Sequence, residues 1–441
     1  MADITPIIAT AYTPESTTST SKVTSSCVTS SLSNGVDYLV LARCGIGGSD
    51  NAAIPAVFFE FGNSASPGSG NTVIGAVRQE GVGNGNHYDS CQMAVATLVT
   101  GDGSSTLFFS FSASTSDTAY IGSQVIVAVP LSELTAGADY FSDVNFDGSD
   151  EQSGIDNTPV AIGGTITFNL PGPTQDWICL SHVRVFFSAS SDASDAMTAA
   201  LEVDSSQVGP SWFKEAEDSA DQSMPAWAYI LEDLAAGDHD FEILVSNRDA
   251  TGNVGSQRHS LVLLRRDALQ QVLESVDSTG IAFASAFSNT TFADGTSVLD
   301  QAITVGSANR YVLSIGLISG TASADGSSVL FDLRNETDGV SHSQEAGENQ
   351  HDGGLDSGMD QCPTLLLGCE QLAASAKTYS VRYRVDSNSG VYGRSPADAG
   401  IRSNLILMEL ATPDAGGDPE AHLIGGKLLR GGLLRRGALV H

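Results

Sequence analysis

Short runs of alternating apolar and polar residues fill most of the chain, as in Thr165–Leu170 (TITFNL) and Tyr379–Val385 (YSVRYRV). Period-two runs of this length, separated by Gly, Asn, Asp and Ser, are typical of half-buried antiparallel strands. Helical periodicity is almost absent. Its best example is Arg266–Glu274 (RDALQQVLE), where we expect a short helical connector. The pattern therefore predicts an all-β protein.

The same succession of strands recurs three times along the chain. An aromatic residue anchors an apolar run at Tyr38, Trp177 and Tyr311, which are 139 and 134 residues apart. Each copy closes on a polar residue followed by an unbroken apolar run: QVIVAV from residue 124, SLVLL from 260 and NLILM from 404. Repeats of this length are whole domains rather than solenoid turns. About eight strands per repeat indicate a two-sheet sandwich, most simply a jelly roll.

We therefore predict three tandem antiparallel β-sandwich domains at residues 1–138, 139–272 and 273–411, followed by a linker and tail at 412–441. With 441 residues, 41% of them apolar, the chain is long enough for three ordinary cores. Neither junction carries a long Pro- or Gly-rich linker. The domains are accordingly expected to pack against one another.

Charge narrows the classes of function. The chain has 52 acidic and 20 basic residues and a formal net charge of -32. Such a surface argues against nucleic-acid binding, because phosphate contacts need Lys and Arg over most of the docking face. No stretch approaches the 18 apolar residues of a membrane span, and the N-terminus lacks the pattern of a secretion signal.

The last residues differ from everything before them. Apolar pairs recur every five residues from Leu423, basic residues lie between them, and no acid follows Glu420. A frayed terminus is one interpretation. We favour a docking peptide that buries its leucines and pairs its positive charges with an acidic surface. The expected docking residues are Leu423, Ile424, Lys427, Leu428, Leu429, Arg430, Leu433, Leu434, Arg435 and Arg436.

Residues 143–151 (DVNFDGSDE) match the beginning of a calcium loop. Asp143, Asn145, Asp147 and Glu151 place oxygen atoms at positions 1, 3, 5 and 9, and a glycine stands at position 6. Position 12, which needs a bidentate Glu, is Gly154. The preferred interpretation is a polar first strand with a turn, with calcium as the alternative, and we expect no cofactor or metal elsewhere.

Three loops contain candidate ligand residues. Glu80 and His87 in the first repeat correspond to Glu345 and His351 in the third, whereas the second repeat has no His in this loop. These side chains could act as acid and base or form a polar rim, and the missing His favours the rim. In the second repeat the candidates are Trp212 and Trp227. They could stack on a sugar, although aromatic residues of a sandwich more often belong to its core.

Signature motifs of enzymes are missing from the sequence. It has no HExxH, no GxSxG, no phosphate-binding loop and no GxGxxG entering a helix. A polysaccharide-degrading enzyme would need two carboxylates about 5–9 Å apart in a cleft, which a sequence does not reveal. We therefore expect a protein that covers, links or binds rather than an enzyme.

Taken together, an acidic all-β chain without a signal, repeated domains and a Gly-Leu-Arg ribbon at Gly425–Gly432 resemble virion proteins of tailed bacteriophages. The relevant class is that of head-decoration, cement and fibre proteins built from tandem jelly-roll-like sandwiches. The resemblance implies a non-enzymatic structural protein of the virion, assembled in the host cytoplasm. The alternative is a carbohydrate- or receptor-binding adhesin that uses the loops of the sandwiches.

The same resemblance implies the partners. They would be other capsid or tail proteins and further copies of the chain, with a homotrimer as the first expectation because virion appendages are commonly symmetric oligomers. Three domains in one chain could instead imitate a trimer on their own. Host-surface glycans are the partners expected under the adhesin alternative.

Overall fold

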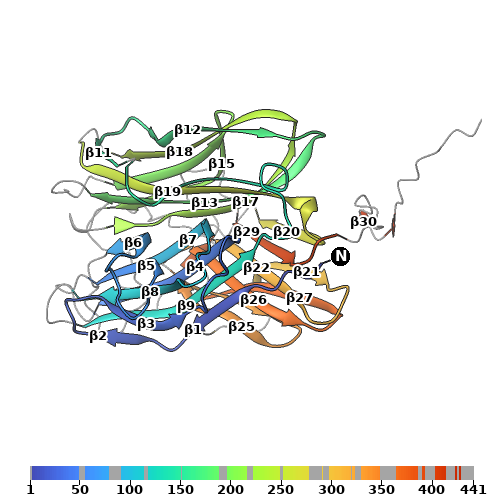
Figure 1. The fold of residues 1–441 in the computed structure, drawn as a ribbon, viewed down its shortest axis with the longest axis horizontal. Coiled ribbons are helices and arrows are strands. Elements are labelled where there is room, and N and C mark those ends of the chain that lie inside the picture. Colours follow the sequence, from blue (N-terminus) through green and yellow to red (C-terminus); the bar gives the residue numbers. More distant parts are fainter. Residues whose placement is uncertain are drawn as a thin grey trace, which may run out of the picture.

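The computed structural model describes residues 2–48, 55–78, 91–113, 118–149, 151–187, 196–215, 222–248, 252–277, 291, 297–318, 320–322, 329–347, 364–385, 390–392, 403–413, 423–424 and 427–428. Strands account for nearly all regular structure in these ranges, and the paired strands run antiparallel. The sheets pack as sandwiches (Figure 1). The prediction of an all-β antiparallel sandwich fold is confirmed.

Sandwich 1 is formed by the N-terminal strands. One sheet has the order β1-β9-β4-β7, with β2 also paired to β9, and the strands β3-β8-β5-β6 lie in the other. The bounds are β1 Ile7–Ala11, β2 Glu15–Thr17, β3 Val23–Val28, β4 Asp37–Gly48, β5 Ala56–Gly62, β6 Thr72–Arg78, β7 Cys91–Thr100, β8 Thr106–Ser112 and β9 Ala119–Pro130.

Sandwich 2 follows. Its first sheet contains β10, β19, β13 and β17, with β11 paired to β19, and its second has the order β12-β18-β14-β15. The bounds are β10 Tyr140–Asn145, β11 Gln152–Ile155, β12 Val160–Leu170, β13 Gln175–Phe187, β14 Ala196–Val203, β15 Ser206–Glu215, β16 Gln222–Ser223, β17 Ala226–Leu234, β18 Gly237–Asn247 and β19 Val254–Arg265.

Sandwich 3 has sheets with the orders β20-β29-β22-β26 and β21-β27-β24-β25, and the short strands β23 and β28 pair with each other. The bounds are β20 Gln271–Asp277, β21 Ser297–Thr304, β22 Arg310–Ile318, β23 Gly320–Ala322, β24 Val329–Asn335, β25 Val340–Gly347, β26 Thr364–Leu372, β27 Ala376–Val385, β28 Gly390–Tyr392 and β29 Ser403–Glu409.

The strand order is the same in all three sandwiches. If the eight main strands of each are lettered A to H along the chain, one sheet is always A-H-C-F and the other always B-G-D-E. This is the arrangement of a jelly roll, in which eight strands form two packed sheets. The division into separately folding domains at residues 1–138, 139–272 and 273–411 stays a prediction.

The A-H-C-F sheets lie inside the molecule, and we call them the inner sheets. Along β4, Val40 and Ala42 belong to the core of sandwich 1, whereas Leu39 and Leu41 belong to a larger core that contains residues of all three sandwiches. These strands are therefore buried on both faces. Burial on both faces explains why their sequences are unbroken apolar runs instead of alternating ones.

The three inner sheets pack in a closed cycle. Strand F of sandwich 1 (β7) lies against C and H of sandwich 2 (β13 and β19). Strand F of sandwich 2 (β17) lies against C of sandwich 3 (β22), and strand F of sandwich 3 (β26) lies against C and H of sandwich 1 (β4 and β9). In Figure 1 sandwich 2 (green and yellow) lies above sandwiches 1 (blue) and 3 (orange). The contacts are head-to-tail and return to the first sandwich, as in a cyclic trimer.

The N-terminal residues pair with the residues that follow β29 at the end of sandwich 3. The Ile4 N–H donates to the Leu410 carbonyl at 3.0 Å, and the Thr412 N–H donates to the Ala2 carbonyl at 2.9 Å. Asp3 forms an antiparallel bridge with Ala411. Sandwich 1 is thereby linked through main-chain hydrogen bonds to the end of sandwich 3.

Two details differ from the sequence prediction. The expected connector contains a 3-10 helix only at Arg266–Ala268, and the chain from Gln271 onward is strand β20, because its apolar residues pair with β29. Among the anchoring aromatics, Tyr38 lies in the core of its sandwich and Trp177 packs beside Phe141, but Tyr311 faces the shared central core. In sandwich 3 the next residue, Val312, belongs to the core between the two sheets.

In the described part of the chain, no helix has the length and apolar character needed to cross a membrane.

Candidate functional site

Sandwiches 1 and 2 are joined by the short strand β16, which pairs with β13 on one side and with β6 on the other. Cross-strand pairing places five residues in one row: Ser112 on β8, Ala56 on β5, Arg78 on β6, Gln222 on β16 and Phe186 on β13. Paired residues of antiparallel strands point to the same face. The row therefore crosses the seam between the two sandwiches on one surface.

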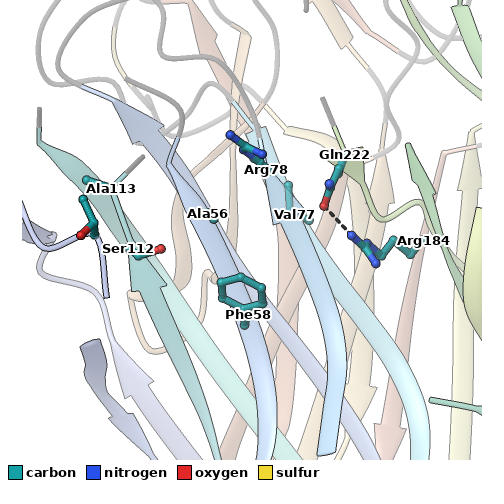
Figure 2. Close-up of a pocket in the computed structure, with 9 residues that line it drawn as sticks. Ala56, Phe58, Val77, Arg78, Ser112, Ala113, Arg184 and Gln222 are labelled. Carbon is teal, nitrogen blue, oxygen red and sulfur yellow. Dashed lines mark hydrogen bonds between the residues drawn. The ribbon is translucent and has the colours of Figure 1, made fainter. Parts of the chain in front are cut away.

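A cavity of about 390 Å³ lies over this row, and we call it the seam cavity. Its volume falls within the range of small-molecule sites, roughly 300–1,000 Å³. Figure 2 shows Phe58 and Val77 between Ser112 on one side and Arg184 with Gln222 on the other. The residues lining it are Thr20, Ala56, Phe58, Val77, Arg78, Ser112, Ala113, Arg184 and Gln222.

Arg184 is held on its wall by neutral amides. Its Nη2 donates to Oε1 of Gln222 at 2.6 Å, and its Nη1 donates to Oε1 of Gln257. The amide of Gln257 is oriented in turn, because its Nε2 donates to Glu151 at 2.8 Å. Burial and the neighbouring Arg258 together lower the pKa of Arg184 to about 10, although the charge of Glu151 opposes the shift, and the guanidinium remains charged at neutral pH.

Lys22, which lies over the Phe58 ring, is paired with a carboxylate. Lys22 lies with its Nζ 3.5 Å from the centre of the Phe58 ring and 3.0 Å from Oε1 of Glu60. Glu60 also accepts hydrogen bonds from Ser110 and Asn71. Burial alone would raise the pKa of Glu60, but the hydrogen bonds it accepts together lower it, so Glu60 is present as a carboxylate.

The described residues that the sequence indicated as ligand-binding are not among those that line the seam cavity. Trp212 and Trp227 are 4% and 0% exposed and belong to the large core that contains residues of all three sandwiches. Neither indole is therefore available to stack on a sugar, and that alternative is wrong. Glu80, His87 and His351 lie outside the described residues, and the structure describes Glu345 only as part of the backbone of β25.

The candidate calcium ligands form hydrogen bonds with neighbouring side chains and main-chain groups. Asp143 accepts from His259 at 2.7 Å, and Asp147 accepts from the Ser149 N–H at 2.7 Å. Asn145 bonds to Ser149 and to the Gly148 N–H, while Glu151 accepts from Gln257. These contacts close the turn after β10. Within the described ranges, His, Cys, Asp and Glu side chains form no group of three that could hold a metal ion.

Little of the tail is described. Leu423–Ile424 (β30) pairs antiparallel with Lys427–Leu428 (β31). The other expected docking residues, Leu429, Arg430, Leu433, Leu434, Arg435 and Arg436, lie outside the described residues. Docking by the tail stays a prediction.

A His-Glu-Tyr contact occurs in sandwich 3, away from the residues that the sequence indicated. Oε1 of Glu370 lies 3.0 Å from Nε2 of His342 and accepts from Tyr379 at 2.5 Å and from Asn335 at 2.8 Å. Burial would raise the pKa of Glu370, but the hydrogen bonds from His342 and Tyr379 lower it on balance. Because Oε1 of Glu370 contacts side chains of three other strands or turns, the carboxylate holds strands together.

The residues of the seam cavity were largely missed by sequence reasoning. One signal was present: Arg184 interrupts the apolar strand residues Val183 and Val185 in a chain with few basic residues. Its partner Gln222 comes from β16, and the pairing of β16 with β6 depends on how the two sandwiches pack.

Comparison with known proteins gives no family. No family model and no curated protein matches the chain. Among solved structures, PNGase F, a glycosylasparaginase from Flavobacterium meningosepticum, is similar at 9% identity and a TM-score of 0.27, covering 62% of this chain and 97% of that one. The structure of Sulfolobus Turreted Icosahedral Virus gives 8% identity, a TM-score of 0.19 and 92% coverage of each chain. The structure of the T13 IBDV viral particle is similar at 7% identity and a TM-score of 0.21, covering 94% of this chain and 82% of that one. Similarities at these scores carry no argument about function.

Proposed function

We propose that the protein is a non-enzymatic structural component of a virus particle, in which one chain supplies a complete ring of three jelly rolls. The observation that carries the proposal is the closed cycle of F-to-C contacts among the inner sheets. Head-to-tail contacts that close produce a ring of fixed size, whereas contacts that do not close produce filaments. Such a ring fits a three-fold position on a particle, where it can cover or cement the proteins beneath it.

The inner sheets support a mechanical role. Leu41 of sandwich 1, Leu180 of sandwich 2 and Ile315 of sandwich 3 are each at most 1% exposed and belong to the same core. The three sandwiches therefore share one hydrophobic core, which includes the residues between the sheets of sandwich 2, while sandwiches 1 and 3 have further cores of their own. A shared core resists separation of the jelly rolls, which is a useful property in a protein that reinforces a shell.

The charge distribution suggests how the ring is attached. The chain carries -32 in total, while its last 21 residues include Lys427, Arg430, Arg435 and Arg436 and no acid. In the proposal, the basic tail docks on an acidic partner protein of the particle, and the acidic ring remains outside. Association through opposite charges is weakened by salt.

The first test is whether the chain is part of particles. Particles from the source organism, purified on a density gradient, should yield its peptides in a fixed ratio to the main shell protein by quantitative mass spectrometry. Absence of the chain from washed particles would overturn the proposal.

The second test concerns the tail. Full-length protein should rebind particles stripped of it, and a chain lacking residues 421–441 should not. A matched variant with Lys427, Arg430, Arg435 and Arg436 replaced by Gln keeps the leucines and isolates the contribution of charge. If the truncated chain rebinds as well as the intact one, the tail is not the docking element.

A carbohydrate-binding adhesin is the second candidate function, and the seam cavity favours it. Hydroxyl groups of Thr20 and Ser112, the amide of Gln222 and the Phe58 ring line one cavity. Sugar-binding sites combine such polar groups with an apolar wall. A glycan array of the intact protein tests this candidate, and an array without any bound glycan counts against it.

A further inference from the structure

We infer that the seam cavity binds an acidic saccharide, whose carboxylate or sulfate is held by Arg78 and Arg184. The inference rests on the second candidate function and names the class of its ligand. The two arginines come from different sandwiches, Arg78 from β6 and Arg184 from β13, and they flank Gln222 of the bridging strand. The binding site therefore exists only where the two sandwiches meet.

Arg184 differs from the ion-paired cations of the described ranges in the kind of partner it has. Several described cations form ion pairs with carboxylates, namely Lys22 with Glu60, Arg265 with Asp139, Arg266 with Asp176, Arg310 with Glu409, Lys377 with Asp338 and Arg382 with Asp332. The hydrogen bonds of Arg184 go instead to the side-chain oxygens of Gln222 and Gln257. Amides fix the guanidinium in position without neutralising it, and the nearest negative charge in this network, Glu151, lies beyond Gln257.

Arg78 adds a second positive charge at the other side of Gln222. It is half-buried, lines the cavity, and forms no ion pair with any residue in the described ranges. In a chain of net charge -32, two arginines around one cavity that pair with no carboxylate in the described ranges mark a place where an anion is favoured. Guanidinium groups suit carboxylate and sulfate because they can donate two parallel hydrogen bonds.

The energetics also favour an anionic ligand. Desolvation of a guanidinium is costly, which is why partial burial lowers the pKa of Arg184, and the charge of Glu151 offsets only part of this effect. An anion bound in the cavity supplies the missing counter-charge in a partly desolvated place, where charged hydrogen bonds are stronger than in water. Binding of the anion therefore recovers part of a cost that the folded protein already bears.

The rest of the lining selects a sugar over a bare ion. The volume of about 390 Å³ leaves room for sugar rings around the charged group. Thr20, Ser112 and Gln222 present donors and acceptors to hydroxyl groups, whereas Phe58, Ala56 and Ala113 form an apolar wall for a ring face. A small inorganic anion would use the arginines and leave this lining unused.

The test is isothermal titration calorimetry of the full chain with four probes. They are a sulfated disaccharide, a disaccharide containing a uronic acid, a neutral disaccharide of matching linkage, and sodium sulfate alone. We expect the acidic disaccharides to bind at least about tenfold more tightly than both the neutral disaccharide and sodium sulfate, with affinity falling as salt is added. The ranking of sulfated against carboxylated probes identifies the anionic group.

Four variants locate the site. Arg184→Gln and Arg78→Gln should each weaken binding of the acidic probes by about tenfold or more. Ser112→Glu adds an acid to the same row without removing an arginine, so it should also weaken binding even if Arg184→Gln fails to fold. Arg334→Gln, in sandwich 3, removes an arginine paired with Glu336 and should leave binding unchanged.

The outcomes separate the inference from the function on which it rests. Equal binding of neutral and acidic disaccharides, abolished by the cavity variants, would retain the adhesin function and overturn the acidic ligand. If sodium sulfate binds as tightly as the sulfated disaccharide, the sugar contributes nothing to binding and the assignment of a saccharide ligand is wrong. Binding of no probe, or binding that survives Arg78→Gln and Ser112→Glu, would overturn the cavity as the site.

Discussion

Nδ1 of His182 in sandwich 2 lies 2.9 Å from the main-chain oxygen of Ala96 in sandwich 1. His182 is fully buried at this contact between two inner sheets, so the imidazole is neutral and donates its Nδ1 proton across the interface. Burial lowers the pKa of His182 to about 4, although the hydrogen bond to Ala96 opposes the shift. The ring of sandwiches consequently contains a group that resists protonation.

The first prediction is a loss of stability in mild acid. An unfolded His takes up its proton near pH 6.5, whereas the folded His182 does so only near pH 4. As the pH falls through this window, the unfolded state binds more protons, and His182 alone removes about 3 kcal/mol from the free energy of unfolding. Urea unfolding at pH 7 and pH 4.5 should show that His182→Gln reduces the acid loss.

His239 gives a control of opposite sign. Burial opposes its charged form, but hydrogen bonds to Asp204 and the Ala235 carbonyl raise its pKa overall. Its stabilising contribution is therefore present at low pH and is lost as the pH rises, so His239→Gln should increase the acid loss. If both variants have the wild-type pH dependence, the assignment of His182 as neutral is wrong.

The second prediction uses two adjacent glycines of β12. Gly163 and Gly164 have φ values of +77° and +75°, so alanine is strained at both. A Cβ at Gly163 would lie 2.4 Å from Cε1 of His259, whereas a Cβ at Gly164 would have no atom within 4 Å. We expect Gly164→Ala to cost about 1 kcal/mol and Gly163→Ala about 2–4 kcal/mol. Thermal unfolding compares the two, and equal losses would contradict the contact with His259.

The sequence predicted the strands well because their burial is local. Outer strands such as β12 bury one face and alternate, so Ile166, Phe168 and Leu170 mark one side of the strand. Inner strands such as β29 bury both faces and have no period, so the run NLILM identifies a strand without showing what lies on its second face. The shared central core could have been inferred from these unbroken runs, but which sandwich covers which could not.

Sequence reasoning failed at the places where distant segments meet. Trp212 and Trp227 were considered as stacking residues because their loop is aromatic, yet both are core residues. Tyr311 and Tyr38 lie on corresponding strands, as the sequence predicted, but their side chains lie on opposite faces of those strands. A shift of one residue moves a side chain to the other face. The seam cavity depends on β16 joining two sandwiches, a pairing that no local pattern encodes.

The third prediction concerns the size of the protein in solution. Because the cycle of inner sheets closes within one chain, a homotrimer is not needed to complete it. The full chain has a mass of 45.6 kDa. We expect light scattering after gel filtration of a chain lacking residues 421–441 to give the mass of a single shortened chain, somewhat below this value. A mass three times larger would mean that further copies are required, and it would favour the homotrimer expected from the sequence.

The fourth prediction tests the junction between the first and third sandwiches. Nη1 of Arg310 lies 2.6 Å from Oε1 of Glu409, and both side chains are only 2% exposed. Glu409→Gln leaves the arginine buried without a full counter-charge, and we expect it to cost about 3–5 kcal/mol. Replacing both residues by apolar ones, Arg310→Met with Glu409→Leu, should restore most of this loss, because neither charge then remains buried.

Asp3 supplies the matched control at the same junction. Its Oδ1 lies 3.3 Å from Nε of Arg310, but its side chain is 63% exposed, so Asp3→Asn should cost at most about 1 kcal/mol. Chemical denaturation of the three variants, with hydrogen exchange at Ile4 and Thr412, measures the stability and the integrity of the terminal pairing. If Glu409→Gln alone leaves both unchanged, the buried pair does not hold the ends of the ring together, and the main-chain bonds of residues 2–4 carry that role.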